Sequence, residues 1–86
     1  MDIDQLSKKI KNKILDNNYI NNVNIIDNTY LHLKHSSHEK NKFHLKLEIS
    51  SDKLKSMNKI ESNKVIYKIL KDELKQHIHS LQILFI

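Results

Sequence analysis

Six histidines among 86 residues are the side chains most able to do chemistry in this sequence. His32, His35 and His38 follow one another at three-residue spacing in a polar stretch, and His79 opens the apolar stretch that ends the sequence. Neutral imidazole is the commonest metal ligand, and its usual pKa of about 6.5 leaves the coordinating form available at neutral pH. The histidines therefore predict either a metal site or a solvated polar loop, because short histidine tracts are signals of low specificity.

The residue types that are missing exclude several other chemistries. The sequence has no cysteine, so it offers no thiolate ligand, no disulfide and no cysteine nucleophile. It has no glycine, which a P-loop, a dinucleotide fingerprint, a nucleophile elbow and a GXXG clamp all require. Ser, His and Asp are present, but no spacing singles out a catalytic triad. We therefore expect a protein that is not an enzyme.

The net charge of +5 is carried by lysine alone, because the sequence contains no arginine. A basic chain suggests nucleic acid or another anionic surface as a partner. The lysines are spread along the chain, however. Gly, Pro, Ala, Arg and Trp are all missing while Asn, Lys and Ile abound, which is typical of a genome with strong base bias. The charge by itself is therefore weak support for nucleic-acid binding.

Two further absences bear on where the protein acts. No apolar run reaches the ~18 residues of a transmembrane helix, and the N-terminal stretch MDIDQLSKK lacks the apolar core of a secretory signal. We therefore expect a cytoplasmic protein without a membrane partner. A chain of 86 residues is expected to fold as one small domain.

The spacing of apolar residues predicts a small α+β fold. Residues 3–17 and 62–76 carry apolar side chains at three- and four-residue steps, which is typical of amphipathic helices, and Ser62 is the expected N-cap of the second helix. Strands are expected at 22–31, 43–50 and 78–85, with a short helical turn at 56–60. Helices then cover one face of a three-stranded sheet.

Strand 43–50 shows the clearest alternation in the sequence. The side chains of Phe43, Leu45, Leu47 and Ile49 are expected on a buried face, and those of His44, Lys46, Glu48 and Ser50 on a wet face. We interpret His44 as an outward-facing strand residue. His77 is interpreted as a residue at the end of the second helix, where a cation favours the helix dipole.

The strand order brings two distant histidines to one rim of the sheet. If the last strand runs parallel to strand 43–50, it starts at the end where the long polar loop leaves the sheet, and His79 enters the sheet near His35. The separation of His35 and His79 tests this hypothesis. The simpler interpretation of His79 is a strand-edge imidazole packed beside Leu81 and hydrogen-bonded to the backbone.

Three stretches also carry the pattern of a known family. They are HLKLEISSDKL (44–54), VIYKILKDELKQHIHSLQI (65–83) and NTYLHLKHSS (28–37). The first is similar to a His–Phe strand segment with Leu in place of two Phe. The second contains IHSL, which matches an Ile/Val–His–Ala–Leu signature with Ser80 in place of Ala. The third is similar to the His–x–x–His start of a variable loop. Over about residues 5–84 the sequence therefore resembles the BolA-like proteins.

The resemblance implies a single BolA-like domain over residues 1–86 with a class II KH-like fold. Its order is helix-strand-strand-(short helix)-helix-strand, with a three-stranded mixed sheet and helices on one face. It also implies a non-catalytic partner of a monothiol glutaredoxin in iron–sulfur trafficking or iron and redox regulation. The two proteins and glutathione would share a [2Fe–2S] cluster that the isolated chain does not hold. His79 is the implied metal ligand, with His35 as the second and His32 and His38 as fallbacks.

Two other functions stay open at this point. A nucleic-acid-binding transcriptional regulator fits the KH-like fold, with Lys64 as a candidate contact, although Ser62, Asn63 and Lys64 replace the family's Arg–His–Arg. A stand-alone zinc or copper site in the histidine loop is the third interpretation, although the loop supplies at most three ligands and structural zinc takes four. The free chain is expected to be a monomer or a weak homodimer.

Overall fold

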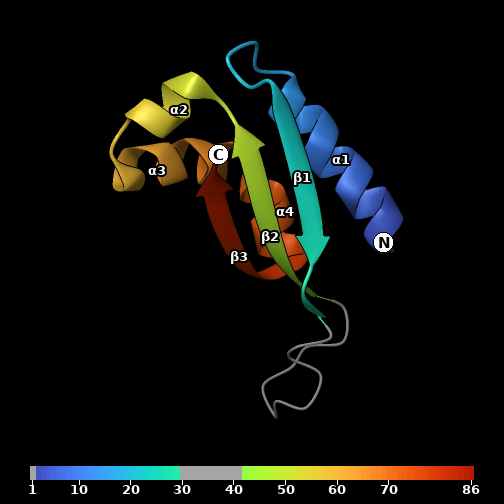
Figure 1. Ribbon diagram of the computed structural model, residues 1–86. Coiled ribbons are helices and arrows are strands. Elements are labelled where there is room, and N and C mark those ends of the chain that lie inside the picture. The colour runs from blue at the N-terminus through green and yellow to red at the C-terminus, as the bar shows by residue number, and fades with distance from the viewer. Residues whose placement is uncertain (1, 30–41) are drawn as a thin grey trace.

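The computed structural model describes residues 2–29 and 42–86 and has the predicted α+β architecture (Figure 1). Its elements are α1 (Ile3–Leu15), β1 (Asn22–Asp27), β2 (Phe43–Ser50), α2 (Asp52–Ser56), α3 (Lys59–Ile69), α4 (Lys71–Gln76) and β3 (Ile78–Phe85). None of the helices in these two ranges is long and apolar enough to cross a membrane.

The three strands form one mixed sheet in the order β1-β2-β3. β1 pairs with β2 in antiparallel register, from Asn22 opposite Ser50 to Asp27 opposite Leu45. β2 pairs with β3 in parallel, as the sequence predicted, so both strands start at the end of the sheet where β1 finishes. Figure 1 shows α1 and α4 on the same side of the strands.

The core lies between the sheet and these helices. The inner face of β2 contributes Leu45, Leu47 and Ile49, each at most 2% exposed, which confirms the predicted alternation of that strand. The helical layer contributes fully buried side chains, namely Leu6, Ile10 and Ile14 from α1, Ile66 from α3, and Leu70 between α3 and α4. Burying one such side chain stabilises the fold by about 1.5–3 kcal/mol, so this interface fixes the position of β2 and β3.

The first helix and the first strand both end earlier than the sequence predicted. α1 begins after Asp2, which forms a capping box with Gln5, and its last helical residue is Leu15 and not residue 17. β1 ends at Asp27 and not at residue 31, because the Asp27 carboxylate accepts a hydrogen bond from the backbone N–H of Thr29 at 2.9 Å. This Asx-type turn draws the chain out of the sheet.

The predicted helix 62–76 is in fact two helices. α3 begins at Lys59 with Asn58 as its N-cap, whose side chain accepts a hydrogen bond from the Glu61 N–H at 2.9 Å. Ser62, the predicted N-cap, lies inside α3 and is 1% exposed. Leu70 leaves the helical conformation and separates α3 from α4. The short helical turn also lies earlier than predicted, as α2, which Ser51 caps through a bond from Leu54 N–H.

A buried carboxylate ties α4 to α1. Glu73 is 0% exposed, and its oxygens lie 2.9 Å from Lys13 Nζ and 3.5 Å from Lys9 Nζ. Desolvation by burial raises the pKa of this carboxyl, but the hydrogen bonds and charges of the two lysines outweigh it and hold the pKa below its ordinary value. This pair was not predicted, because Glu73 lies beside the apolar residues of the predicted helix 62–76 and nothing in the spacing links it to residues 3–17.

Candidate functional site

The candidate site lies at the end of the sheet where β1 finishes and β2 and β3 start. Asn28 N–H donates to the His44 carbonyl at 2.8 Å, and Phe43 N–H donates to the His77 carbonyl at 2.8 Å. These bonds bring the two described residues that flank the polar loop, Thr29 and Lys42, to the same rim as the start of β3. The predicted placement of β3 relative to the loop ends is therefore confirmed.

His79 occupies an irregularity in the β2–β3 ladder. In the ladder Phe43 is opposite Ile78 and His44 is opposite Ser80. His79 is therefore one extra residue of β3 between these two pairs. A β-bulge turns the extra side chain away from the regular alternation of the strand. Ile78 is 3% exposed and belongs to the core, whereas His79 is exposed. The bulge thus presents an imidazole to solvent near the start of β3, a strand that otherwise alternates between half-buried and exposed residues.

His44 is more than the outward-facing strand residue that the sequence predicted. It faces the side of the sheet opposite the helices, but it is only 6% exposed. Its Nδ1 lies 2.7 Å from Ser80 Oγ, and its ring centroid lies 5.0 Å from that of His79, with the two planes tilted by 40°. Sequence reasoning missed this residue, because the bulge that brings β3 against it is a property of strand register.

The other predicted ligands divide into two groups. His32, His35 and His38 lie outside the described residues, so the separation of His35 and His79 stays a prediction. His77 lies where the sequence placed it, as the C-cap of α4, with its N–H donating to the Glu73 carbonyl at 2.8 Å. Its carbonyl also accepts a hydrogen bond from the Phe43 N–H, so the backbone of His77 joins the end of α4 to the start of β2.

The histidine corner, defined as His44, His79 and Ser80, can supply imidazole nitrogen to a metal but cannot enclose one. No group of three or more His, Cys, Asp or Glu side chains gathers as a metal site within 2–29 and 42–86. An exposed imidazole at a strand end fits the donor set of a [2Fe–2S] centre, in which His replaces Cys on one iron of Rieske proteins. The sulfur ligands of such a centre must come from elsewhere, since the chain contains no cysteine.

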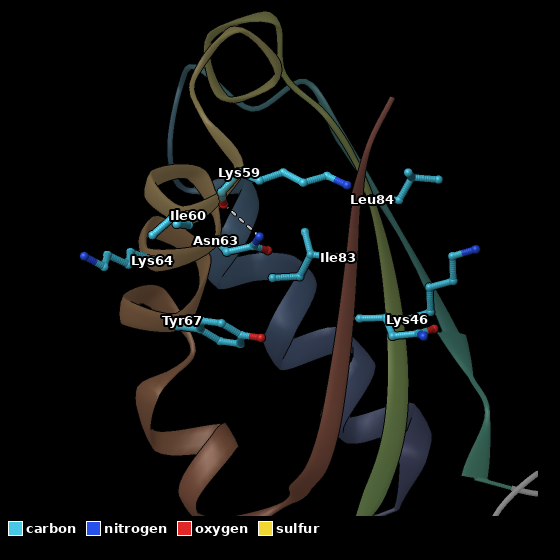
Figure 2. Close-up of a pocket in the computed structure, with 9 residues that line it drawn as sticks. Lys46, Lys59, Ile60, Asn63, Lys64, Tyr67, Ile83 and Leu84 are labelled. Carbon is cyan, nitrogen blue, oxygen red and sulfur yellow. Dashed lines mark hydrogen bonds between the residues drawn. The ribbon is translucent and has the colours of Figure 1, made fainter.

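A second surface feature lies between α3 and the far half of β3. It is a groove with a volume of about 650 Å³, shown in Figure 2. Lys46, Lys59 and Lys64 contribute its cationic groups, and Ile60, Tyr67 and Leu84 contribute apolar surface. Lys64, the predicted nucleic-acid contact, lies here and pairs with Glu61 at 3.8 Å. Asn63 is held in the groove by a 2.8 Å bond from its Nδ2 to the Lys59 carbonyl.

Three features define the class of fold. The sheet is mixed and has the order β1-β2-β3, helices cover one of its faces, and its last strand begins with an Ile–His pair. The family model for "BolA-like protein" matches residues 15–85, and the chain belongs to that family. Among curated protein sequences, none matches this chain.

Two solved structures from Arabidopsis thaliana share the fold. The BolA domain of SufE1 is 27% identical, with a TM-score of 0.74, and the match covers 91% of this chain and 86% of that one. BolA1 is 22% identical, with a TM-score of 0.73 and the same coverage, and supports the fold alone. The class II KH-like order that the resemblance implied is confirmed, except that α3 and α4 stand in place of its single long helix.

Proposed function

We propose that this protein is a non-catalytic partner of a monothiol glutaredoxin and that it completes the ligand set of a shared [2Fe–2S] cluster. The position of His79 carries the proposal: it lies exposed in a bulge, at the rim where residues 29 and 42 leave the sheet. The first ligand from this chain is His79. The second is a loop histidine, His35, with His32 and His38 as fallbacks.

The donor chemistry of the chain supports a shared cluster over a private one. A glutaredoxin contributes its own thiolate and that of glutathione, and this chain contributes two imidazoles and no thiolate. When bound, the cluster supplies one-electron redox chemistry, and imidazole ligation raises its reduction potential relative to all-thiolate ligation. The role of this chain is to present nitrogen donors at an accessible corner. The arrangement requires reduced partner thiols, which a compartment such as the cytoplasm maintains.

The first prediction concerns the ligand from β3. Mixing the wild-type chain with a monothiol glutaredoxin, glutathione and cluster should give a heterodimer with the visible absorption and circular dichroism of a His-ligated [2Fe–2S] centre. His79→Ala should abolish this His-ligated spectrum. His77→Ala removes an imidazole two residues away, at the end of α4, and should leave the spectrum unchanged.

The same experiment identifies the second ligand. Single His32→Ala, His35→Ala and His38→Ala variants should separate into one that changes the spectrum and two that do not, and His35→Ala is the expected one. Unchanged spectra in both His79→Ala and His35→Ala would sink the ligand assignment. Metal titration of the isolated chain tests the stand-alone alternative: zinc or copper bound tightly without any partner would favour a site in the histidine loop.

A second candidate function, nucleic-acid binding by a transcriptional regulator, is favoured by one observation: three lysines line the groove between α3 and β3. Against it, the chain has no glycine for a GXXG clamp and no arginine for bidentate base contacts.

The second prediction separates groove binding from diffuse charge attraction in a DNA titration. If the groove binds DNA, Lys64→Gln should weaken binding more than Lys75→Gln, which removes the same charge from exposed α4 surface. The logarithm of affinity should fall with the logarithm of salt by about 0.9 per phosphate contact. Equal weakening by both variants, with no preference among sequences, would show attraction to the net charge alone.

A further inference from the structure

The residue that departs from the family signature makes a specific contact. Ser80 stands where the signature has Ala, and its Oγ lies 2.7 Å from His44 Nδ1. Alanine has no hydroxyl and cannot form this bond. The bond crosses from β3 to β2 at the first regular pair after the bulge, directly beside His79. This chain therefore carries a side-chain link at the histidine corner that the signature residue would not provide.

The ring at the other end of this link is held on several sides. The His44 N–H donates to Thr29 Oγ1 at 3.1 Å, and its carbonyl accepts the Asn28 N–H at 2.8 Å. These bonds fix the backbone, and the bond to Ser80 fixes the rotation of the ring. With 6% of the residue exposed, the ring also has little space to change rotamer. The His44 ring is thus held in one orientation on the outer side of the sheet.

The His79 ring contacts the ring of His44. The ring centroids are 5.0 Å apart with a 40° tilt, within the 4.5–7 Å range in which aromatic rings interact favourably. Contact with a fixed ring restricts the rotamers of His79, and metal sites gain affinity when a supporting group orients a ligating imidazole.

We propose that Ser80 and His44 form a brace that orients the His79 imidazole for iron ligation. In this brace His44 is a positioning residue and not a ligand, and Ser80 fixes its ring. The proposal rests on the proposed function for the role of His79. A simpler role for the same bond is to tie β3 to β2. If the Ser80–His44 bond only ties the strands together, its removal leaves the orientation of the His79 ring unchanged. If it is part of a brace, its removal changes that orientation.

The isolated chain tests the brace without any cluster. Ser80→Ala restores the signature residue and should fold normally, and His44→Gln keeps a polar side chain on β2. In both variants we expect shifted ring ¹H and ¹⁵N resonances for His79 and side-chain couplings that differ from those of the wild type. Ser56→Ala, which removes an exposed hydroxyl in α2, is the matched control and should leave the His79 signals in place. His79 couplings identical to wild type in both Ser80→Ala and His44→Gln overturn the brace.

The complex tests whether the orientation matters for iron. With a monothiol glutaredoxin, glutathione and cluster, Ser80→Ala should lose cluster about tenfold faster than wild type, as removal of groups that orient metal ligands commonly does. The reduced complex should also show altered ¹⁴N hyperfine coupling from His79. An unchanged loss rate and coupling in Ser80→Ala contradict the brace, whereas wild-type protein that binds no cluster contradicts the proposed function. The measurements on the isolated chain stay decisive for the brace in that second case.

Discussion

At the scale of single residues, Glu73 shows how the helical layer is held together. Its carboxylate is fully buried and meets two lysines of α1 that are themselves 33% and 45% exposed at the side chain. Replacing the buried partner of such a pair leaves the lysines without their counter-charge in a partly solvated setting. The pair joins α4 to α1 and therefore supports the base from which β3 and His79 start.

The third prediction is that Glu73→Gln lowers the free energy of unfolding by about 2 kcal/mol, measured by urea denaturation at neutral pH. Glutamine keeps the size of the side chain, so the loss reports the charge. Glu61→Gln breaks an exposed pair with Lys64 at 3.8 Å and should change stability by less than about 0.5 kcal/mol. A loss in Glu73→Gln no greater than in Glu61→Gln would contradict this account.

The pH dependence of stability follows from the same carboxyl. The pKa of Glu73 in the folded protein lies below the ordinary value of 4.5, so the unfolded state binds the proton more readily. The stabilisation is therefore fully present above pH 4.5 and is lost as pH falls through the folded-state pKa. The stability difference between wild type and Glu73→Gln should accordingly shrink on acidification in urea titrations at successive pH values.

At the scale of elements, the start of α3 separates two candidate caps. Asn58 accepts the Glu61 N–H, whereas the Ser62 hydroxyl bonds back to the Asn58 and Lys59 carbonyls within the helix. The fourth prediction is that Asn58→Ala destabilises the protein by about 1 kcal/mol in thermal unfolding. Ser62→Ala removes only this back-bonding and should cost less. The reverse order would restore Ser62 as the helix N-cap.

The elements also show which structural features the spacing of apolar residues predicts and which it does not. Strand 43–50 was predicted to the residue, because alternation over eight positions leaves a single face to bury. The break at Leu70 was not predicted, since one residue outside the helix keeps the apolar spacing of Ile66 and Leu74 almost unchanged. The predicted helix therefore had the correct buried face but the wrong number of segments.

The candidate site was predictable to the same limited extent. His79 was recognised because it opens an apolar strand and matches a family signature. His44 was interpreted as an ordinary surface residue, because its burial depends on which residue of β3 lies opposite it. That register includes a one-residue bulge, and no local pattern in either strand encodes it.

At the scale of the whole molecule, all of the buried hydrophobic residues found in the described ranges belong to one core shared by the sheet and helices. The fifth prediction is that replacing residues 30–41 with a flexible Gly–Ser linker retains cooperative unfolding, because this core stays intact. The same variant loses the loop histidines and should lose the wild-type cluster spectrum with a glutaredoxin. Circular dichroism on heating checks the first outcome, and visible spectroscopy checks the second.

A contradictory result would be equally informative about the architecture. A linker variant that no longer unfolds cooperatively would show that residues 30–41 contribute to the core. A linker variant that keeps the wild-type cluster spectrum would show that both imidazoles come from the sheet, since His79 and His44 are the histidines that remain at the corner.

The parallel pairing of β2 with β3 has a consequence for when the protein becomes competent. His44 and His79 meet only after the chain has passed through α2, α3 and α4 and returned to the sheet. Contacts between residues this distant in sequence form late, because loop closure opposes them. A nascent or half-assembled chain therefore lacks the contact between the His44 and His79 rings. The contact between these two rings therefore forms only in the completely folded domain.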